Sequence, residues 1–293
     1  MELLSNCPVC SGTQFNDFLE TKDFLVSHET FKIVQCTDCG FRFTNPRPSI
    51  DEIGKYYQSE NYISHSNTKR GIINFIYQIA RRFTIKGKVS RLKRNHPAAK
   101  NILDYGCGTG EFLLEMKHSG FEVWGIEQND HARFAASKKI NVFAPDQLYL
   151  FENQQFDIVS LWHVLEHIHS LNEVLTQFHR ILKSNGRLIV AVPICDSFDA
   201  RYYKEMWAAL DLPRHLYHFN LSSLGNLFGK KQMEIKSVHK MPLDGFYVSA
   251  LSEKYRKSAF GFLRAIFIGT IAMIRSYFQK SESSSLLFII QKK

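Results

Sequence analysis

The sequence predicts an α/β fold in which helices wind around a largely parallel sheet, preceded by a small metal-bound module. Two observations predict it. Strand-like apolar runs alternate with helical patterns from residue 100 onward, and two closely spaced cysteine pairs lie within the first 40 residues. The 293 residues are 44% hydrophobic and 22% charged, a composition that excludes a disordered, collagen-like or coiled-coil protein.

Four of the six cysteines form two pairs near the start of the sequence. Two residues separate the cysteines of each pair, which is the spacing that turns both thiolates toward one tetrahedral Zn²⁺. Strand-like runs follow at 31–35 (FKIVQ) and 41–44 (FRFT). The pattern predicts a zinc ribbon over residues 1–48, with two disulfides as the alternative. Four protein ligands leave no open position, so the zinc is expected to be structural and bound by Cys7, Cys10, Cys36 and Cys39.

A basic segment, residues 49–99, follows the ribbon. No Asp or Glu occurs between Glu60 and Asp104, whereas ten Lys and Arg residues lie from Lys69 to Lys100. Apolar residues recur among them at helical spacing, which predicts a helical linker or cap. Its basic face is either solvated while the helix packs on the next domain, or it binds lipid headgroups, acidic sugar nucleotides or RNA.

The α/β domain is expected over residues 100–293. Five strands are predicted at 101–106, 121–127, 140–145, 156–162 and 187–193. Helices are predicted after the first and fourth of these strands, at 111–120 and 171–186. Two further strands are predicted at 233–240 and 286–290, with a helical insertion at 241–283 between them.

The insertion contains an apolar stretch, AFGFLRAIFIGTIAMI, at 259–274. No uninterrupted apolar run reaches the roughly 18–20 residues of a membrane span, so an integral membrane protein is not expected. The stretch predicts a lid over a hydrophobic substrate or a peripheral membrane contact. A buried packing helix or a homodimer interface is the alternative.

A glycine-rich loop, DYGCGTG, follows the first strand of the domain. Glycines let the backbone approach a ligand closely, and the helix after the loop offers free N–H groups. A dinucleotide fingerprint would need glycine at position 111, where this sequence has Glu111. Glu127 ends the next predicted strand, where a carboxylate can accept hydrogen bonds from both hydroxyls of an adenosine ribose.

Four motifs of this domain resemble the class I S-adenosylmethionine-dependent methyltransferases: ILDYGCGTG (102–110), WGIE (124–127), FDIVSLWHVLEHI (156–168) and LKSNGRLIVAVP (182–193). The cysteine pairs and LPRHLYHFN (212–220) are similar to a branch with an N-terminal zinc ribbon, near the ubiquinone-type small-molecule O-methyltransferases. The resemblance implies a Rossmann-like seven-stranded sheet with helices on both faces. It also implies that the last two strands are antiparallel neighbours.

The resemblance implies S-adenosyl-L-methionine as cofactor and assigns residues to it. Asp104 and the loop glycines would hold the methionine end, and Glu127 the ribose. A loop after the third strand would flank the adenine, and a tryptophan after the fourth would border the sulfonium. The implied set is Asp104, Gly106, Gly108, Gly110, Glu127, Asp146, Gln147 and Trp162.

Candidate catalytic residues follow the strands that would face the cofactor. Methyl transfer needs positioning, and it needs a base where the acceptor must lose a proton. If a helix starts at once after the fourth strand, His163, Glu166 and His167 share one face. One of them, or a divalent ion that they hold, would then activate a hydroxyl; the alternative is that Glu166 and His167 only anchor the loop. His215 is expected at the same edge of the sheet.

The sequence thus predicts methyl transfer to an oxygen of a small molecule, with a quinone-like, lipid-linked or saccharide acceptor. An RNA methyltransferase is the first alternative, because a zinc ribbon and a basic helix can bind phosphates. A sugar C-methyltransferase and a non-catalytic binding protein of the same fold are further alternatives. No signal-peptide pattern opens the sequence, which predicts a cytoplasmic protein with surface contact to a membrane as an option.

Overall fold

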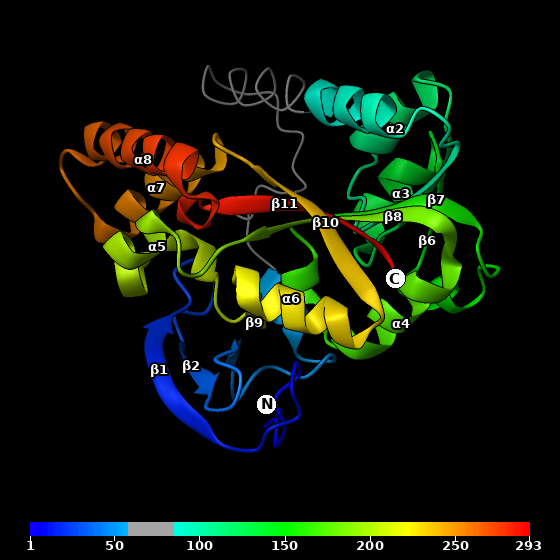
Figure 1. Cartoon of the computed structure of the whole chain (residues 1–293). Helices are drawn as coiled ribbons and strands as arrows, with labels where there is room; N and C mark the ends of the chain where they lie inside the picture. The colour runs from blue at the N-terminus through cyan, green and yellow to red at the C-terminus, as the bar shows by residue number, and fades with distance from the viewer. Residues whose placement is uncertain (58–84) are drawn as a thin grey trace.

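The computed structural model describes residues 1–57 and 85–293 (Figure 1). The first part of the predicted basic helical segment, with Lys69, Arg70, Arg81 and Arg82, lies outside the described residues. Residues 85–95 are helical, as predicted, and bury Val89 and Leu92 against the α/β body. Lys86, Lys93 and Arg94 of this helix line an open pocket of about 480 Å³.

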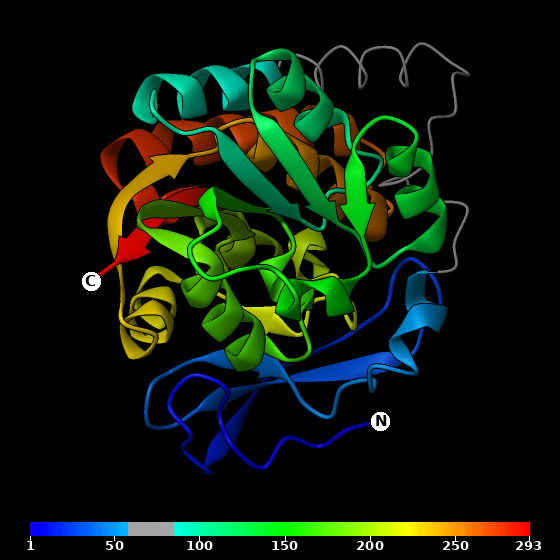
Figure 2. The same cartoon turned by 90° about the vertical axis from the view of Figure 1, so that its right-hand side faces the viewer.

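The N-terminal module is a four-stranded antiparallel sheet in the order β1-β2-β3-β9. Its strands are β1 (Phe15–Lys22), β2 (Thr30–Cys36), β3 (Arg42–Thr44) and β9 (Tyr217–His218). The strands predicted at 31–35 and 41–44 are therefore confirmed. In Figure 2 this sheet lies as a separate layer against one side of the α/β body. Its last strand, however, comes from the LPRHLYHFN segment, so residues 1–48 do not complete the sheet alone.

The α/β body is built on a seven-stranded mixed sheet in the order β10-β11-β8-β7-β4-β5-β6. Its strands are β4 (Asn101–Tyr105), β5 (Glu122–Ile126), β6 (Asn141–Phe143), β7 (Phe156–Trp162), β8 (Leu182–Pro193), β10 (Met233–Lys240) and β11 (Ser285–Lys292). The first five are parallel, and β11 runs antiparallel between β8 and β10. All seven predicted strands are present, and the predicted fold class is confirmed.

Seven helices with their full bounds lie in the described part of this body. They are α2 (Glu111–His118), α3 (Asp130–Ser137), α4 (Leu171–Ile181), α5 (Phe198–Tyr203), α6 (Leu221–Lys230), α7 (Asp244–Arg256) and α8 (Gly261–Phe278). The helix predicted to run to residue 186 ends at Ile181. Leu182 instead pairs with Phe156, and a register shift in β7 and β8 accommodates the following residues.

The helix expected directly after β7 does not form. His163 has φ 56°, in the left-handed region, and its N–H donates to the carbonyl of Ala191 at 2.9 Å. Because of this additional hydrogen bond to β8, the chain leaves the sheet only after His163. It then forms a short 3₁₀ helix, η4 (Leu165–His167). The predicted helical face of His163, Glu166 and His167 is therefore wrong, and tertiary contacts decide where their side chains lie.

The predicted helical insertion is the pair α7–α8, seen in orange and red in Figure 1. Because β10 runs parallel to β8, the insertion emerges at the edge where the parallel strands end. The two helices pack closely, since a Cβ at Gly269 would approach Phe246 to 2.6 Å. With 18 residues and a mean hydropathy of 1.3, α8 meets the length and composition of a membrane span, which the sequence pattern did not suggest.

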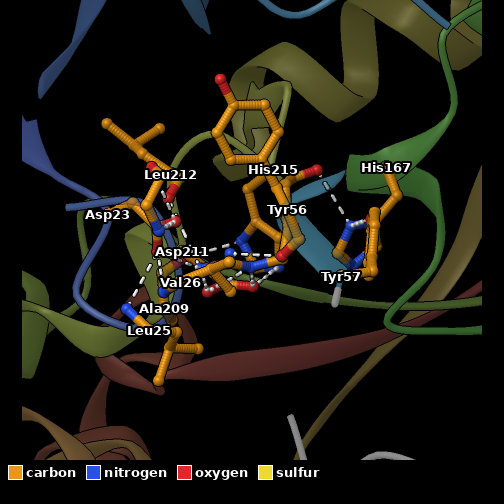
Figure 3. A network of polar contacts seen from close by, with 12 residues as sticks. Asp23, Leu25, Val26, Tyr56, Tyr57, His167, Ala209, Asp211, Leu212 and His215 are labelled. Carbon is orange, nitrogen blue, oxygen red and sulfur yellow. Dashed lines mark hydrogen bonds and ion pairs between the residues drawn. The ribbon is translucent and has the colours of Figure 1, made fainter. Parts of the chain in front are cut away.

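A buried guanidinium joins the N-terminal module to the α/β body. Arg214 donates to Asp23 at 2.9 Å, to Asp211 at 2.7 Å and to the carbonyl of Tyr56 at 2.8 Å. Figure 3 shows Asp23, Asp211 and Tyr56 of this network. Its side chain is 1% exposed. Burial alone would raise the pKa of Asp23, but the bond to Arg214 and backbone N–H groups hold it below its usual value. The Asp23 carboxylate therefore stays ionised beside the buried cation.

Arg214→Ala is expected to lower the free energy of unfolding by about 3–5 kcal/mol, because it leaves buried carboxylates without their counter-charge. Urea unfolding at pH 7 measures the change. Lys236→Ala, which removes the exposed ion pair with Glu234, is the control and should leave the midpoint unchanged. Equal effects of the two substitutions would show that the Arg214 network does not join the module to the body.

Candidate functional site

The glycine loop after β4 is shaped by three residues in the left-handed region. Gly106, Gly108 and Gly110 have φ values of 78°, 56° and 82°, which side chains with a Cβ rarely adopt. Glu127, directly after β5, accepts hydrogen bonds from the N–H of Gly108 at 2.7 Å and of Asn129 at 2.8 Å. Each carboxylate oxygen can accept a second donor. The chemistry of this donor and acceptor set fits a nucleoside whose ribose hydroxyls bond to Glu127.

The loops after β4 and β7 are in direct contact. A Cβ at Gly106 would approach Val164 to 2.5 Å, so the two segments touch without a gap. Beneath them, the hydroxyl of Ser160 donates to the buried carboxyl of Asp104 at 2.6 Å. Burial raises the pKa of Asp104 to about 7. Asp104 thus supports the sheet below the loop, and its contact with a cofactor stays a prediction.

The remaining implied cofactor residues lie at the same edge of the sheet. Asp146 is exposed and Gln147 half-buried in the short 3₁₀ helix η3 (Pro145–Tyr149), which follows β6. Trp162 ends β7, and its ring packs against Phe112 with centroids 5.5 Å apart. The ammonium of Lys88 lies 3.8 Å from the same ring. Contacts with adenine and sulfonium stay predictions for these residues.

His163 bridges two carboxylates from different elements. Its Nε2 lies 3.2 Å from Asp244, the first residue of α7, and its Nδ1 lies 3.7 Å from Glu166. Burial opposes protonation of the ring, but the two carboxylates outweigh it and raise the pKa of His163 to about 9. At neutral pH His163 is therefore an imidazolium. It supplies a fixed positive charge and cannot act as a base.

The structure brings Glu166, His167 and His215 together. One ligand atom from each lies within 4.8 Å of the others. The His167 and His215 rings meet edge to face, with centroids 4.6 Å apart (Figure 3). Burial and the neighbouring charge of His215 lower the pKa of His167 to about 4, so this ring is neutral. His215 thus lies beside Glu166 and His167, whereas His163 lies against Asp244; the catalytic roles expected for these residues stay predictions.

The four predicted zinc ligands also converge. The sulfur atoms of Cys7 and Cys39 are 3.6 Å apart, and those of Cys10 and Cys36 are 3.4 Å apart. Zn–S bonds of about 2.3 Å in a tetrahedron separate sulfurs by about 3.8 Å. None of the six cysteines is bridged, and these separations exceed a disulfide bond. The cluster fits one tetrahedral zinc with no open position.

Sequence reasoning missed two residues of this region. Asp244 begins the insertion, and only the parallel placement of β10 beside the site brings it to His163. The hydroxyl of Tyr57 lies 3.0 Å from Nδ1 of His167. Neither residue belongs to a motif; the position of Asp244 directly after a strand that ends at the site edge was the available signal.

Comparison with known proteins identifies the α/β body. A family model described as a methyltransferase domain matches residues 77–238, more than half of the chain. A magnesium protoporphyrin IX methyltransferase structure from Synechocystis superposes with a TM-score of 0.51 at 12% identity, covering 78% of this chain and 90% of that one. It supports the fold alone.

Curated relatives match shorter stretches. A sterol 4-C-methyltransferase from Caenorhabditis elegans is 29% identical over 31% of this chain and 30% of its own length. A demethylmenaquinone methyltransferase from Leptospira interrogans is 25% identical over 34% of this chain and 46% of its own length. The chain spans from 30% to 57% of the length of four such relatives.

Asp244→Asn is expected to move the titration midpoint of His163 from about 9 toward the usual value near 6.5. Because the folded pKa is raised, the pair stabilises the protein below pH ~6.5, and this contribution disappears as pH rises through 9. Histidine NMR titration measures the midpoint, with the exposed Asp146→Asn as control. A midpoint that Asp244→Asn leaves in place would disprove the pairing.

Proposed function

The chain belongs to the methyltransferase domain family, and from this premise we propose that it transfers a methyl group from S-adenosyl-L-methionine to an oxygen of a small molecule. The observation that carries the proposal is the joined pair of loops after β4 and β7. The loop after β4 presents its left-handed glycines and donates the Gly108 N–H to Glu127, directly after β5, and the loop after β7 presents His163 and Glu166. A cofactor and an acceptor would therefore meet at one edge of the sheet.

Different described residues are proposed to bind the cofactor and the acceptor. S-adenosyl-L-methionine, when bound, supplies an activated methyl group. The backbone of the glycine loop and the carboxylate of Glu127 would hold it. The imidazolium of His163, which Asp244 holds in place, would orient the polar end of an acceptor. Because positioning supplies much of the rate acceleration in such displacements, these contacts account for most of the proposed chemistry.

The insertion supports a hydrophobic or lipid-linked acceptor and peripheral contact with an anionic membrane. Large apolar side chains on or beside α8 are exposed: Phe260, Phe262, Leu263, Ile266, Phe267, Ile274, Tyr277 and Phe278. The three acids of residues 241–283 are buried or half-buried and all ion-paired, two of them with the exposed Arg264 and Arg275. The exposed charges of the insertion are basic: Lys254, Lys257, Arg264, Arg275 and Lys280. Such a face suits the interface of an anionic bilayer.

Two further observations bear on the proposal. Relatives named for a sterol and for demethylmenaquinone support an apolar acceptor. The cysteine cluster supports a structural zinc that holds the knuckles of the N-terminal module. The predicted cytoplasmic location stays a prediction.

Glu127→Ala is expected to weaken S-adenosyl-L-methionine binding about 10–100-fold, the effect of losing hydrogen bonds to a charged acceptor. Isothermal titration calorimetry measures the affinity. Glu122→Ala, on the exposed start of the same strand, is the matched control and should bind normally. Unchanged affinity in a folded Glu127 variant would disprove the ribose assignment.

Combined Phe262→Ser and Phe267→Ser substitutions are expected to reduce co-sedimentation with phosphatidylglycerol vesicles at least tenfold. Each removes an aromatic ring worth about 1.5–3 kcal/mol of burial. Phe134→Ser, an exposed phenylalanine on α3, is the matched control. Equal vesicle binding would contradict the membrane contact, and loss of a dimer in the double variant would assign the face to a second copy of the chain.

A further inference from the structure

Glu166 is a buried carboxylate whose ion-pair partner, His163, does not reach hydrogen-bond distance. Its side chain is 1% exposed, and neither oxygen has a hydrogen-bond partner among the described residues. The charge on Nδ1 of His163 is 3.7 Å away, too far for a hydrogen bond. A buried ion without close donors normally coordinates a metal or pairs with a cation.

Hydrogen bonds to backbone carbonyls orient the rings of the two histidines beside Glu166. Nδ1 of His167 lies 3.0 Å from the carbonyl of Arg214, and Nδ1 of His215 lies 2.9 Å from the carbonyl of Ala209. A carbonyl oxygen only accepts hydrogen bonds, so each Nδ1 carries a proton, and the Tyr57 oxygen beside Nδ1 of His167 is a second acceptor for that N–H. In each ring Nε2 is then the nitrogen that remains to bind a ligand, and Asp211 lies 4.0 Å from Nε2 of His215. Metal-binding histidines are commonly oriented by such a second bond.

We propose that Glu166, His167 and His215 bind a divalent first-row transition-metal ion, separate from the zinc of the cysteine cluster. Their ligand atoms lie within 4.8 Å of one another, and a small closure would bring them to the separation of about 3.4 Å that bonds near 2.1 Å require. Two imidazoles and one carboxylate suit Zn²⁺, Fe²⁺ or Mn²⁺ better than Mg²⁺ or Ca²⁺, which favour oxygen ligands.

This site differs from the set that the sequence suggested. His163, expected as a ligand, is engaged by Asp244, and His215 takes its place from a segment far along the chain. Three protein ligands leave coordination positions open, unlike the closed cysteine cluster. The ligand loop also touches the glycine loop through Val164.

The role of the ion, unlike its binding, rests on the proposed function. An ion at this position supplies a Lewis acid that lowers the pKa of an acceptor hydroxyl.

Metal counting on the full chain tests the proposal. After equilibration with Zn²⁺ and removal of free metal, the wild type is expected to hold two ions per chain by mass spectrometry of the metal. His215→Gln and Glu166→Gln should each hold one, with the cysteine cluster still occupied. His169→Gln, which changes a half-buried histidine bonded to the carbonyl of Pro48, is the matched control and should hold two.

Cobalt absorption spectra of the wild type test the site without relying on the folding of the variants. The second equivalent of Co²⁺ added to the wild type should produce d–d absorption without thiolate charge-transfer bands. A single ion in the wild type, or two ions in both folded variants, overturns the proposal. Calorimetry with S-adenosyl-L-methionine on the same samples tests the proposed function separately from the metal site. A protein that holds two ions but does not bind the cofactor would support the metal site and disprove the proposed methyl transfer.

Discussion

The site depends on a buried cation that three segments of the chain share. Arg214 bonds to Asp23 of the N-terminal module, to Asp211 before it and to the carbonyl of Tyr56. Its own carbonyl lies against Nδ1 of His167. Because an unpaired charge cannot remain buried at low cost, these contacts fix the path of the whole segment. The ion network therefore sets where His215 and His167 meet.

The N-terminal module acts on the site through the same segment. Its strand β3 pairs with β9, and the hydroxyl of Thr44 donates to the carbonyl of His215 at 2.8 Å. Phe41 packs on Phe219, with ring centroids 5.6 Å apart. A zinc-bound ribbon would thus stabilise a surface that supports His215 from behind. This arrangement gives the cysteine cluster a positioning role without contact to any reacting group.

Local patterns were sufficient to predict the strands and the converging cysteines. Alternation of apolar runs placed all seven strands of the large sheet, including β10 at its observed bounds. The site was predicted only in part, because its geometry depends on contacts between distant segments. The hydrogen bond from His163 to Ala191 extends β7, so the expected helix does not form there. Asp244 lies beside His163 because β10 ends at the same edge of the sheet. No spacing in the sequence encodes either contact.

We propose that this edge of the sheet moves a methyl group to a lipid-soluble acceptor. Transfer of radiolabelled methyl from S-adenosyl-L-methionine to separated lipid, saccharide and RNA fractions tests this proposal most directly. We expect label in the lipid fraction, lost when Glu127 is replaced by Ala. Label confined to RNA, or no transfer by a folded protein that binds the cofactor, would contradict it.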